Sequence, residues 1–370
     1  MLPLRWSDDA GLDELTDYLG RLARWVDVTV VDGSGADVYA RHAARWRGLV
    51  RHRPVRPWPG RNGKVAGVVT GVRAARHEHV VIADDDVRYD YDGLAEVQTL
   101  LGRADLVRPQ NYFDPTPWHA RWDTGRTLLN RAFGADYPGT YGVRRSTFVA
   151  MGGYDGDVLF ENLELARTIR AAGGRELVAS SLFVCRRPPA AHHFLRQRVR
   201  QAYDDFAQPA RLLVEASVAP VLLLALGRAA RTDRETRSQV MRSVAIAMAA
   251  TVASAEAGRR RHGGTTVFPA TAALWAPAWV LERSICVWAA FGYRLLGGVP
   301  YAGQRLRVAA HSVRELRRRI QSAAPAPDRA SGRVHSTDLL VDQEDRTGRQ
   351  AQDGSGQRAD PDAPGLVGVL

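Results

Sequence analysis

The chain has 370 residues and a formal net charge of +11 at pH 7. This length is enough for one α/β domain of about 200 residues and an appended region. Its two cysteines, Cys185 and Cys286, have no paired spacing, so neither a disulfide framework nor a cysteine-ligated zinc site is indicated, and a reducing compartment fits. The basic balance favours nucleic acid, an anionic membrane or phosphorylated substrates as partners. No signal peptide is predicted, because the N-terminus turns acidic soon after Trp6.

Strand-like and helix-like segments alternate from the N-terminus to about residue 190. Short β-branched runs predict strands, and apolar residues at helical spacing predict helices. The predicted strands are Leu2–Trp6, Val26–Val31, Val80–Ala83 and Leu106–Val107, and the predicted helices are Asp9–Trp25, Asn62–Arg76 and Leu94–Leu101. This alternation indicates a Rossmann-like α/β domain with a mostly parallel sheet that is covered on both faces.

Two of the predicted strands end at aspartates. Asp32 follows Val26–Val31, and the triplet Asp84–Asp86 follows Val80–Ala83. Ligands bind outside the carboxyl ends of strands in such sheets, so we expect both sites to face one crevice. Clustered carboxylates cannot all be buried in charged form without a partner. A divalent cation such as Mg²⁺ would supply that partner, although an acidic turn or a helix cap before Tyr91 is the alternative.

The character of the chain changes after about residue 190, where a basic stretch is followed by the apolar segments 212–227, 240–255 and 268–298. A spanning helix needs about 20 apolar residues, and each of these segments contains charged side chains. Four arginines in the loop 228–239 favour the cytosolic side. A single pass over 212–227 from a cytosolic catalytic domain would put that loop outside. Re-entrant or interfacial helices, or another topology, would resolve this conflict.

The chain is therefore predicted to have three parts: a catalytic-type α/β domain at residues 1–205, an apolar helical membrane-associated region at 206–320, and a polar tail at 321–370. The composition of the tail predicts disorder. A soluble helical domain, in which the apolar segments are simply core, is the alternative for the middle part.

Six short motifs occur in a fixed order within residues 1–205. They are Val30-Val31-Asp32-Gly33-Ser34, Asn62-Gly63-Lys64, Ala83-Asp84-Asp85-Asp86-Val87, Gly152-Gly153-Tyr154-Asp155, Glu161-Asn162-Leu163-Glu164-Leu165 and Gln197-Arg198-Val199-Arg200. Together they resemble family-2 glycosyltransferases with the GT-A fold, in the membrane-associated branch similar to ceramide glucosyltransferases. The resemblance implies an inverting enzyme that moves a hexose from a UDP- or GDP-linked donor to a hydroxyl of a lipid-like acceptor. It also implies a Mn²⁺ or Mg²⁺ cofactor and a catalytic domain at the cytosolic face of the cell membrane.

Five residues are implied to bind the donor or its metal. Asp84 and Asp86 match the DxD motif, and side chains two apart on an extended strand point the same way, which suits one metal ion. Asp85 would face elsewhere, toward the ribose. Asp32 would bind the nucleotide base, with an ordinary turn aspartate as the alternative. Lys64 would lie near the diphosphate, since a helix N-terminus favours phosphate and lysine adds a point charge; a solvated lysine is the alternative.

The catalytic base implied by the resemblance is an aspartate that follows a glutamate. Asn162 stands at that position, and an asparagine cannot accept a proton at neutral pH. We hypothesise that Glu161 is the base and that Glu164, three residues on, is the reserve. The substitution also leaves open a second function, a non-catalytic protein that binds a nucleotide sugar or a lipid headgroup.

The acceptor side is implied to involve Gly152, Gly153 and Asp155, because paired glycines let backbone approach a substrate closely. An ordinary glycine turn is the alternative. The aromatic-rich stretch Gln110–Asp123 is a further candidate, since sugars and isoprenoid chains pack on aromatic faces. A core or lid role for that stretch is equally open.

Gln197 and Arg200 resemble the QxxRW signature, which closes over the donor and acceptor at the membrane interface. Their helical spacing puts them on one face, but Gln201 replaces the tryptophan. A basic interfacial helix that attracts anionic lipid headgroups is the alternative. Nucleic-acid binding is not expected, because no helix-turn-helix, RNP or zinc pattern is present.

Overall fold

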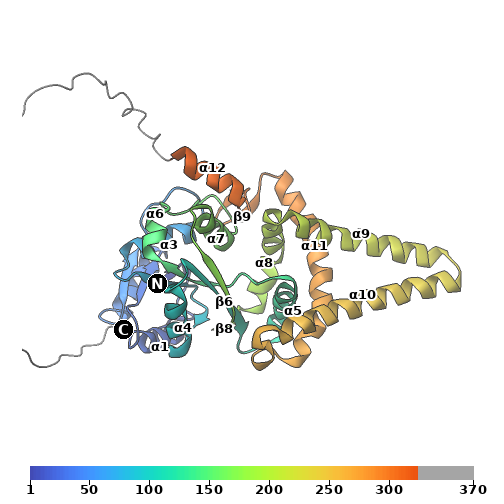
Figure 1. Cartoon of the computed structure of the whole chain (residues 1–370), viewed down its shortest axis with the longest axis horizontal. Coiled ribbons are helices and arrows are strands. Elements are labelled where there is room, and N and C mark those ends of the chain that lie inside the picture. The colour runs from blue at the N-terminus through green and yellow to red at the C-terminus, as the bar shows by residue number, and fades with distance from the viewer. Residues whose placement is uncertain (324–370) are drawn as a thin grey trace, which may run out of the picture. The chain divides into compact units, whose positions relative to one another are not determined.

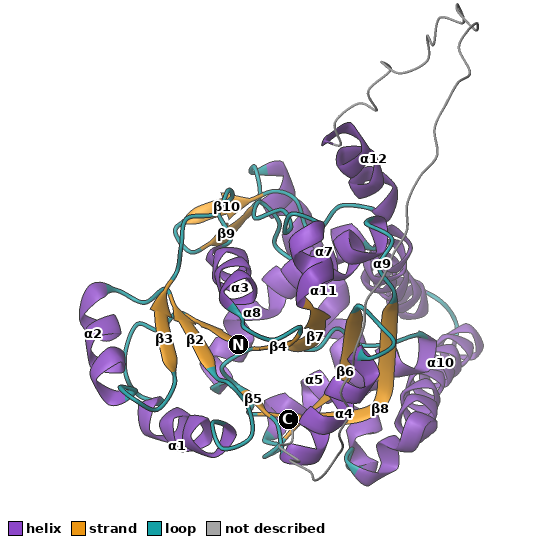
Figure 2. Cartoon of the chain, turned by 60° about the vertical axis from the view of Figure 1, so that its left-hand side comes forward, coloured by secondary structure: helices purple, strands orange, loops and turns teal. Residues whose placement is uncertain are grey.

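The computed structural model describes residues 1–323. Strand β1 (Leu2–Leu4) pairs in parallel with β2 (Thr29–Asp32). Strand β2 pairs in parallel with β3 (Arg51–Pro54), which lies beside it in Figure 2. On the other side of β1, the main chain of Met1 bonds to β4 (His79–Ala83). Its amino group donates to the Val81 carbonyl at 2.6 Å, and its carbonyl accepts from the Ala83 N–H at 3.1 Å. The resulting order β3-β2-β1-β4 is that of a doubly wound sheet, and its order reverses between β1 and β4.

A five-stranded mixed sheet continues from β4. Its order is β4-β7-β6-β8-β5, formed with β5 (Val87–Arg88), β6 (Leu106–Phe113), β7 (Thr140–Arg144) and β8 (Glu176–Arg186). Strands β6 and β8 pair in parallel, whereas β7 is antiparallel to both β4 and β6. The predicted parallel pairing is therefore found between β1 and β2, between β2 and β3, and between β6 and β8. Strands β7 and β8 had no predicted counterpart, since neither stands out from its surroundings as an isolated β-branched run.

Helices cover these strands. They are α1 (Leu12–Leu22), α2 (Ala36–Arg45), α3 (Gly63–Ala74), α4 (Tyr91–Leu101), α5 (Trp118–Phe133), α6 (Arg145–Ala150), α7 (Glu161–Ala171) and α8 (Ala191–Tyr203). Two of them start at side-chain caps, because the Asn62 carboxamide accepts from the Lys64 N–H and the Asp90 carboxylate accepts from the Gly93 N–H. The aromatic-rich stretch is divided between the end of β6 and the start of α5.

The main core lies between α3 and the sheet. Four valines of α3, Val65, Val68, Val69 and Val72, are buried against apolar side chains of β4, β6 and β7. Burying each valine contributes about 1.5–3 kcal/mol relative to exposure. This packing fixes the start of α3, which carries Lys64, relative to the end of β4, which carries the three aspartates.

The C-terminal part contains the long helices α9 (Pro209–Arg231), α10 (Arg234–Arg260) and α11 (Ala276–Leu295), the hairpin β9 (Val299–Tyr301) and β10 (Gln304–Leu306), and α12 (Val313–Ala323). Helix α11 packs against α5, α8 and α9, and α10 packs against α5. Helices α9 and α10 extend away from the sheets and are joined at their far ends (Figure 1). Residues 1–321 together form one compact unit. The predicted boundary near residue 205 stays a prediction, and the predicted tail lies, beyond residue 323, outside the described part.

Two helical segments, 209–231 and 234–266, are long and apolar enough to cross a membrane, by length and composition. Helix α9 exposes the apolar side chains Leu213, Val214, Val221, Leu223, Leu224 and Leu226. The third predicted apolar segment, 268–298, has a different environment. Its helix α11 buries Trp279 and Val287 among neighbouring helices of the same compact unit, although it also exposes Ile285 and Trp288. The two exposed helices are therefore weak support for membrane association, and the topology stays a prediction.

Candidate functional site

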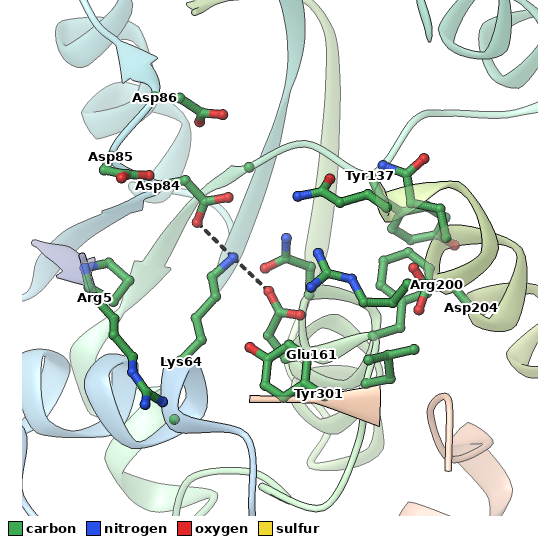
Figure 3. A pocket seen from close by; sticks show the side chains of 18 of the residues that line it. Arg5, Lys64, Asp84, Asp85, Asp86, Tyr137, Glu161, Arg200, Asp204 and Tyr301 are labelled. Carbon is green, nitrogen blue, oxygen red and sulfur yellow. Dashed lines mark ion pairs between the residues drawn. The ribbon is translucent and has the colours of Figure 1, made fainter. Parts of the chain in front are cut away.

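A cavity of about 1060 Å³ lies outside the carboxyl ends of β1, β2 and β4. This is the crevice at which the strand order reverses, the usual ligand site of a doubly wound sheet. Its walls come from distant parts of the chain: residues 3–7, the start of α3, the end of β4, residues 137–139, the start of α7, helix α8 and the β9–β10 hairpin. Figure 3 shows acidic and basic side chains of these elements facing one another.

Lys64 joins two walls of the cavity. Its Nζ atom lies 2.6 Å from Asp84 Oδ1 and 2.6 Å from Glu161 Oε1 (Figure 3). Burial opposes the lysine charge, but the Asp84 and Glu161 carboxylates outweigh it and raise the pKa of Lys64 well above its ordinary value. Lys64 is therefore a permanent cation, and it neutralises part of the acidic cluster.

The Arg186 guanidinium contacts both Asp86 and Asp84. Arg186 Nε donates to Asp86 Oδ2 at 2.8 Å, and Arg186 Nη2 lies 3.7 Å from Asp84 Oδ2. Burial raises the pKa of Asp86 to about 6. The guanidinium thus lies against both carboxylates of the predicted DxD motif.

The residues around this pair fit a divalent cation. Asp86 Oδ1 is enclosed and has no hydrogen-bond partner within the described residues, so it is an acceptor without a donor. Gly139 leaves room beside Asp84, because a Cβ atom at position 139 would lie 2.8 Å from Asp84 Oδ2. Carboxylate oxygens are the donors that Mg²⁺ and Mn²⁺ prefer. Asp84 and Asp86 could therefore hold such an ion.

Asp85 also lines the cavity, and its carboxylate accepts a hydrogen bond from the Trp6 indole N–H. Trp6 in turn donates its backbone N–H to Ser34 Oγ at 2.9 Å. These two bonds tie the chain after β1 to the ends of β2 and β4. The predicted separation of Asp85 from the two metal-binding candidates is consistent with this arrangement.

Asp32 is placed differently from the prediction. It does not line the cavity; its neighbours Val31 and Gly33 do. Its buried carboxylate contacts His42 Nδ1 at 2.7 Å and His52 Nε2 at 3.0 Å, and it accepts from the Ser34 N–H at 2.9 Å. Burial opposes its charge, but hydrogen bonds from His52, Ser34 and His42 hold the pKa of Asp32 well below its usual range.

The three side chains Asp32, His42 and His52 offer ligand atoms within 4.8 Å of one another. Their shortest contacts have hydrogen-bond lengths. The expectation that Asp32 and the triplet at the end of β4 face one crevice is thus not met. Helix α2 and strand β3 each bring a histidine over Asp32, and neither contact is visible in the local sequence around it.

Helix α7 presents its two glutamates to different environments. Glu161, the first residue of the helix, lines the cavity, and so does Asn162, whose side-chain amide donates to the Pro138 carbonyl at 3.1 Å. Glu164 is buried elsewhere, where it accepts from the His311 N–H at 2.7 Å and contacts His311 Nδ1 at 2.9 Å. The prediction of Glu164 as the reserve base is therefore wrong, because its carboxylate does not reach the cavity.

The predicted acceptor segment also lies away from the cavity lining. Gly152 and Gly153 have φ angles of +80° and +95° in the turn after α6. A Cβ atom at Gly153 would lie 2.7 Å from the Trp58 ring. Asp155 forms an ion pair with Arg319 of α12 at 3.0 Å. These residues serve a tight turn and its packing, which is the alternative considered for the glycines.

Gln197, Arg200 and Gln201 of α8 line the cavity, and the donor-binding role of the first two stays a prediction. The Gln197 carboxamide lies against His193, and the Arg200 guanidinium lies 5.6 Å from the centre of the Tyr301 ring. Sequence reasoning missed the other lining side chains, among them Arg5, Tyr137, Arg186, Asp204, Arg283 and Tyr301. Only Asp204 had a usable signal, since it follows Gln197 and Arg200 at helical spacing.

Residues 37–108 match the model of glycosyl transferase family 21. The matched segment runs from α2 to the start of β6 and includes Lys64 and the three aspartates. No curated protein matches the chain by sequence. The fold is mixed α/β, and the similarity to the family covers only the segment from α2 to the start of β6.

Several solved structures are similar to the chain at low identity. The mannosyltransferase PcManGT from Pyrobaculum calidifontis, in complex with GDP-Man and Mn²⁺, has 15% identity and a TM-score of 0.42 over 78% of this chain and 85% of that one. Glucosyl-3-phosphoglycerate synthase from Mycobacterium tuberculosis, in complex with Mn²⁺, UDP and phosphoglyceric acid, has 17% identity and a TM-score of 0.36 over 52% and 71%. S. aureus TarS 1–349 has 11% identity and a TM-score of 0.38 over 82% and 94%.

Proposed function

We propose that the protein is an inverting glycosyltransferase that moves a hexose from a nucleotide-diphosphate sugar to a hydroxyl of a lipid-like acceptor at the cytosolic face of a membrane. One observation carries this proposal: the crevice between β1 and β4 brings the carboxylates Asp84 and Asp86 together with the cations Lys64, Arg186 and Arg200 in a single cavity. Such a site suits a ligand with a diphosphate and a metal ion.

The donor diphosphate would lie among the cations of the cavity. Lys64 sits at the start of α3, where the helix N-terminus adds a favourable field for phosphate. Arg200 faces the cavity from α8 and supplies a second positive charge. A Mg²⁺ or Mn²⁺ ion held by Asp84 and Asp86 would act as a Lewis acid on the leaving diphosphate when bound. The UDP- or GDP-linked donor is the one that the sequence motifs imply.

The acceptor is proposed to be lipid-like because of the helices next to the cavity. Helix α8 lines the cavity with Gln197 and Arg200, and the chain continues from it into α9, which exposes a row of leucines and valines. The turn that joins α9 to α10 is flanked by Arg228, Arg231, Arg234 and Arg237. Apolar faces next to arginines suit the boundary between lipid tails and anionic headgroups.

An inverting transfer needs a base for the acceptor hydroxyl. Asn162 cannot fill this role, and its amide is already used in a bond to Pro138. Two carboxylates of the cavity could do so: Glu161, the base hypothesised from the sequence, and Asp204 at the end of α8. The base would take the proton of the acceptor hydroxyl, whose oxygen attacks the anomeric carbon in line with the bond to the leaving diphosphate.

The test is turnover of UDP- and GDP-sugars by the detergent-purified full chain with Mn²⁺ or Mg²⁺, with and without membrane lipid extract. Release of the nucleoside diphosphate that requires the metal and Asp84 would support the proposal and identify the donor. Asn162 favours a second function, a non-catalytic protein that binds nucleotide sugar or lipid headgroups. Metal-dependent nucleotide binding without turnover in any lipid extract would establish that alternative.

A further inference from the structure

The two cavity carboxylates that could act as a base have different partners. Glu161 Oε1 lies 2.6 Å from Lys64 Nζ. An acceptor hydroxyl would have to compete with this ammonium group for the oxygen, and protonation of Glu161 would break the ion pair. Glu161 is therefore committed to holding Lys64 in place between α3 and α7.

Within residues 1–323, Asp204 forms no such ion pair. It follows the last residue of α8 and lines the cavity. Its Oδ1 atom is enclosed and has no hydrogen-bond partner in the part of the chain that the structure describes. The next residue, Asp205, is instead paired with Arg283 and Arg211, each at 3.2 Å. An enclosed acceptor without a donor is costly, so a donor from a bound ligand would satisfy Asp204.

The position of Asp204 suits contact with an acceptor. Figure 3 places it beside Arg200, across the cavity from Asp84–Asp86, with Glu161 between them. The donor diphosphate would occupy the side of the three aspartates, so the acceptor would enter from the side of Asp204. Helix α9, which exposes apolar side chains, starts shortly after it at Pro209.

The electrostatic surroundings of Asp204 favour proton transfer. Burial, together with the charges of Asp205 and Glu161, raises the pKa of Asp204 well above its usual range, while Arg200 and Arg283 act in the opposite direction. A base is most efficient when its pKa approaches the working pH. The same arginines would stabilise the carboxylate in its charged form.

We propose that Asp204 is the catalytic base of the transfer reaction and replaces the aspartate that Asn162 lacks, an inference that rests on the proposed function. The Asp204 carboxylate takes the proton of the acceptor hydroxyl as the hydroxyl oxygen forms a bond to the anomeric carbon of the donor sugar. The bond from that carbon to the diphosphate oxygen breaks, and its electron pair leaves with the nucleoside diphosphate. The protonated Asp204 then returns its proton to water.

The experiment is hydrolysis of UDP-glucose and GDP-mannose by the full chain in detergent with Mn²⁺, in which water is the acceptor. Asp204→Asn should lower kcat by about 10²–10⁴-fold and leave the donor KM within about two-fold, because it removes the base but no donor contact. In wild type, kcat should rise as the pH increases through the pKa of Asp204, and this rise should be absent in the variant. Asp204→Glu should restore part of kcat.

Two control variants separate the possible results. Asp92→Asn changes an exposed aspartate outside the cavity and should behave as wild type. Glu161→Gln should lower activity but keep the pH-dependent rise of kcat. Full turnover by Asp204→Asn, or loss of the rise only in Glu161→Gln, would overturn the assignment of Asp204 while the proposed function stands. Absence of metal-dependent turnover in wild type would overturn both.

Discussion

The ends of β2 and β4 carry aspartates in similar sequence contexts but in opposite situations. Asp32 at the end of β2 is enclosed by His42, His52 and the Ser34 N–H, and its hydrogen-bonding capacity is used within the protein. At the end of β4, one enclosed oxygen of Asp86 has no hydrogen-bond partner among residues 1–323, and its neighbours face a large cavity. The ends of β2 and β4 thus hold a carboxylate that is bonded within the protein and a set of carboxylates that line a cavity.

This difference shows that position at a strand end does not decide the role of a carboxylate. The partners decide it, and they come from distant segments: α2 and β3 at Asp32, α3 and β8 at the aspartate triplet. Where the protein supplies every hydrogen bond, the group stabilises the fold. Where it leaves an acceptor open, a ligand is the expected partner.

The largest expected effect is a loss of turnover when an aspartate at the end of β4 is substituted. Asp84→Ala removes a candidate metal ligand and a partner of Lys64, so donor hydrolysis with Mn²⁺ should fall by about 100-fold or more. The circular-dichroism spectrum and the thermal midpoint should stay close to those of Asp92→Asn. An Asp84→Ala enzyme with undiminished metal-dependent turnover would contradict the assignment.

At the end of β2 the effect should be on stability instead. Asp32→Asn leaves the two histidines beside a neutral amide and should lower the free energy of unfolding by about 2 kcal/mol at pH 7, measured by urea denaturation. The pKa of Asp32 is held below its ordinary value of 3.8, so its stabilisation is present above that value and lost as the pH falls through the native pKa. The difference between variant and wild type should therefore shrink in acid. A difference that is constant down to the acid transition would contradict this interpretation.

A smaller effect should be seen on donor affinity. Lys64 is the only lysine of the chain, and Lys64→Gln should raise the donor KM about ten-fold, because one charge-assisted bond to the diphosphate is lost. Lys64→Arg keeps the positive charge and should recover part of the lost donor affinity. Steady-state kinetics with each nucleotide sugar measures both. An unchanged KM in Lys64→Gln would show that the lysine only holds Asp84 and Glu161 together.

The smallest effect concerns the second glutamate of α7. The hydrogen bond to Glu164 raises the pKa of His311 above its ordinary value of 6.5, although burial opposes this. The stabilisation that protonated His311 provides is thus fully present below pH 6.5 and is lost as the pH rises through the pKa of His311 in the native state. Wild type should lose about 1 kcal/mol of stability across this interval. His311→Gln should lack that pH dependence, and an identical slope in both proteins would count against the pair.

Much of the fold could be predicted from the sequence because its signals are local. Local sequence patterns predict three elements: the valine-rich run before Asp84, the helix capped by Asn62 and the leucine-rich helix α1. Each was predicted within a few residues of its observed bounds. The position of Asp84–Asp86 beside the cavity follows from such elements, and their role in metal and donor binding stays a prediction. The position of a side chain was missed where it depends on long-range contacts, as at Asp32, whose histidines lie 10 and 20 residues away.

Helical geometry explains the other differences. Glu161 and Glu164 are three residues apart, yet the burial of α7 sends one to the cavity and the other to His311. Tyr301 reaches the site from the β9–β10 hairpin, and its hydroxyl donates to Asn62 Oδ1 at 3.1 Å across 239 positions of sequence. No local sequence pattern around Tyr301 predicts this contact, so only the tertiary structure identifies it.

The most direct test of the contrast between the two strand ends is calorimetric binding of UDP and GDP, with and without Mn²⁺, to wild type, Asp84→Asn and Asp32→Asn. Asp84→Asn should lose the Mn²⁺-dependent part of nucleotide binding while its fold is intact. Asp32→Asn should keep that part, although the protein is less stable. Mn²⁺-dependent binding that survives in Asp84→Asn and disappears in folded Asp32→Asn would contradict the placement of the nucleotide-sugar site at the end of β4.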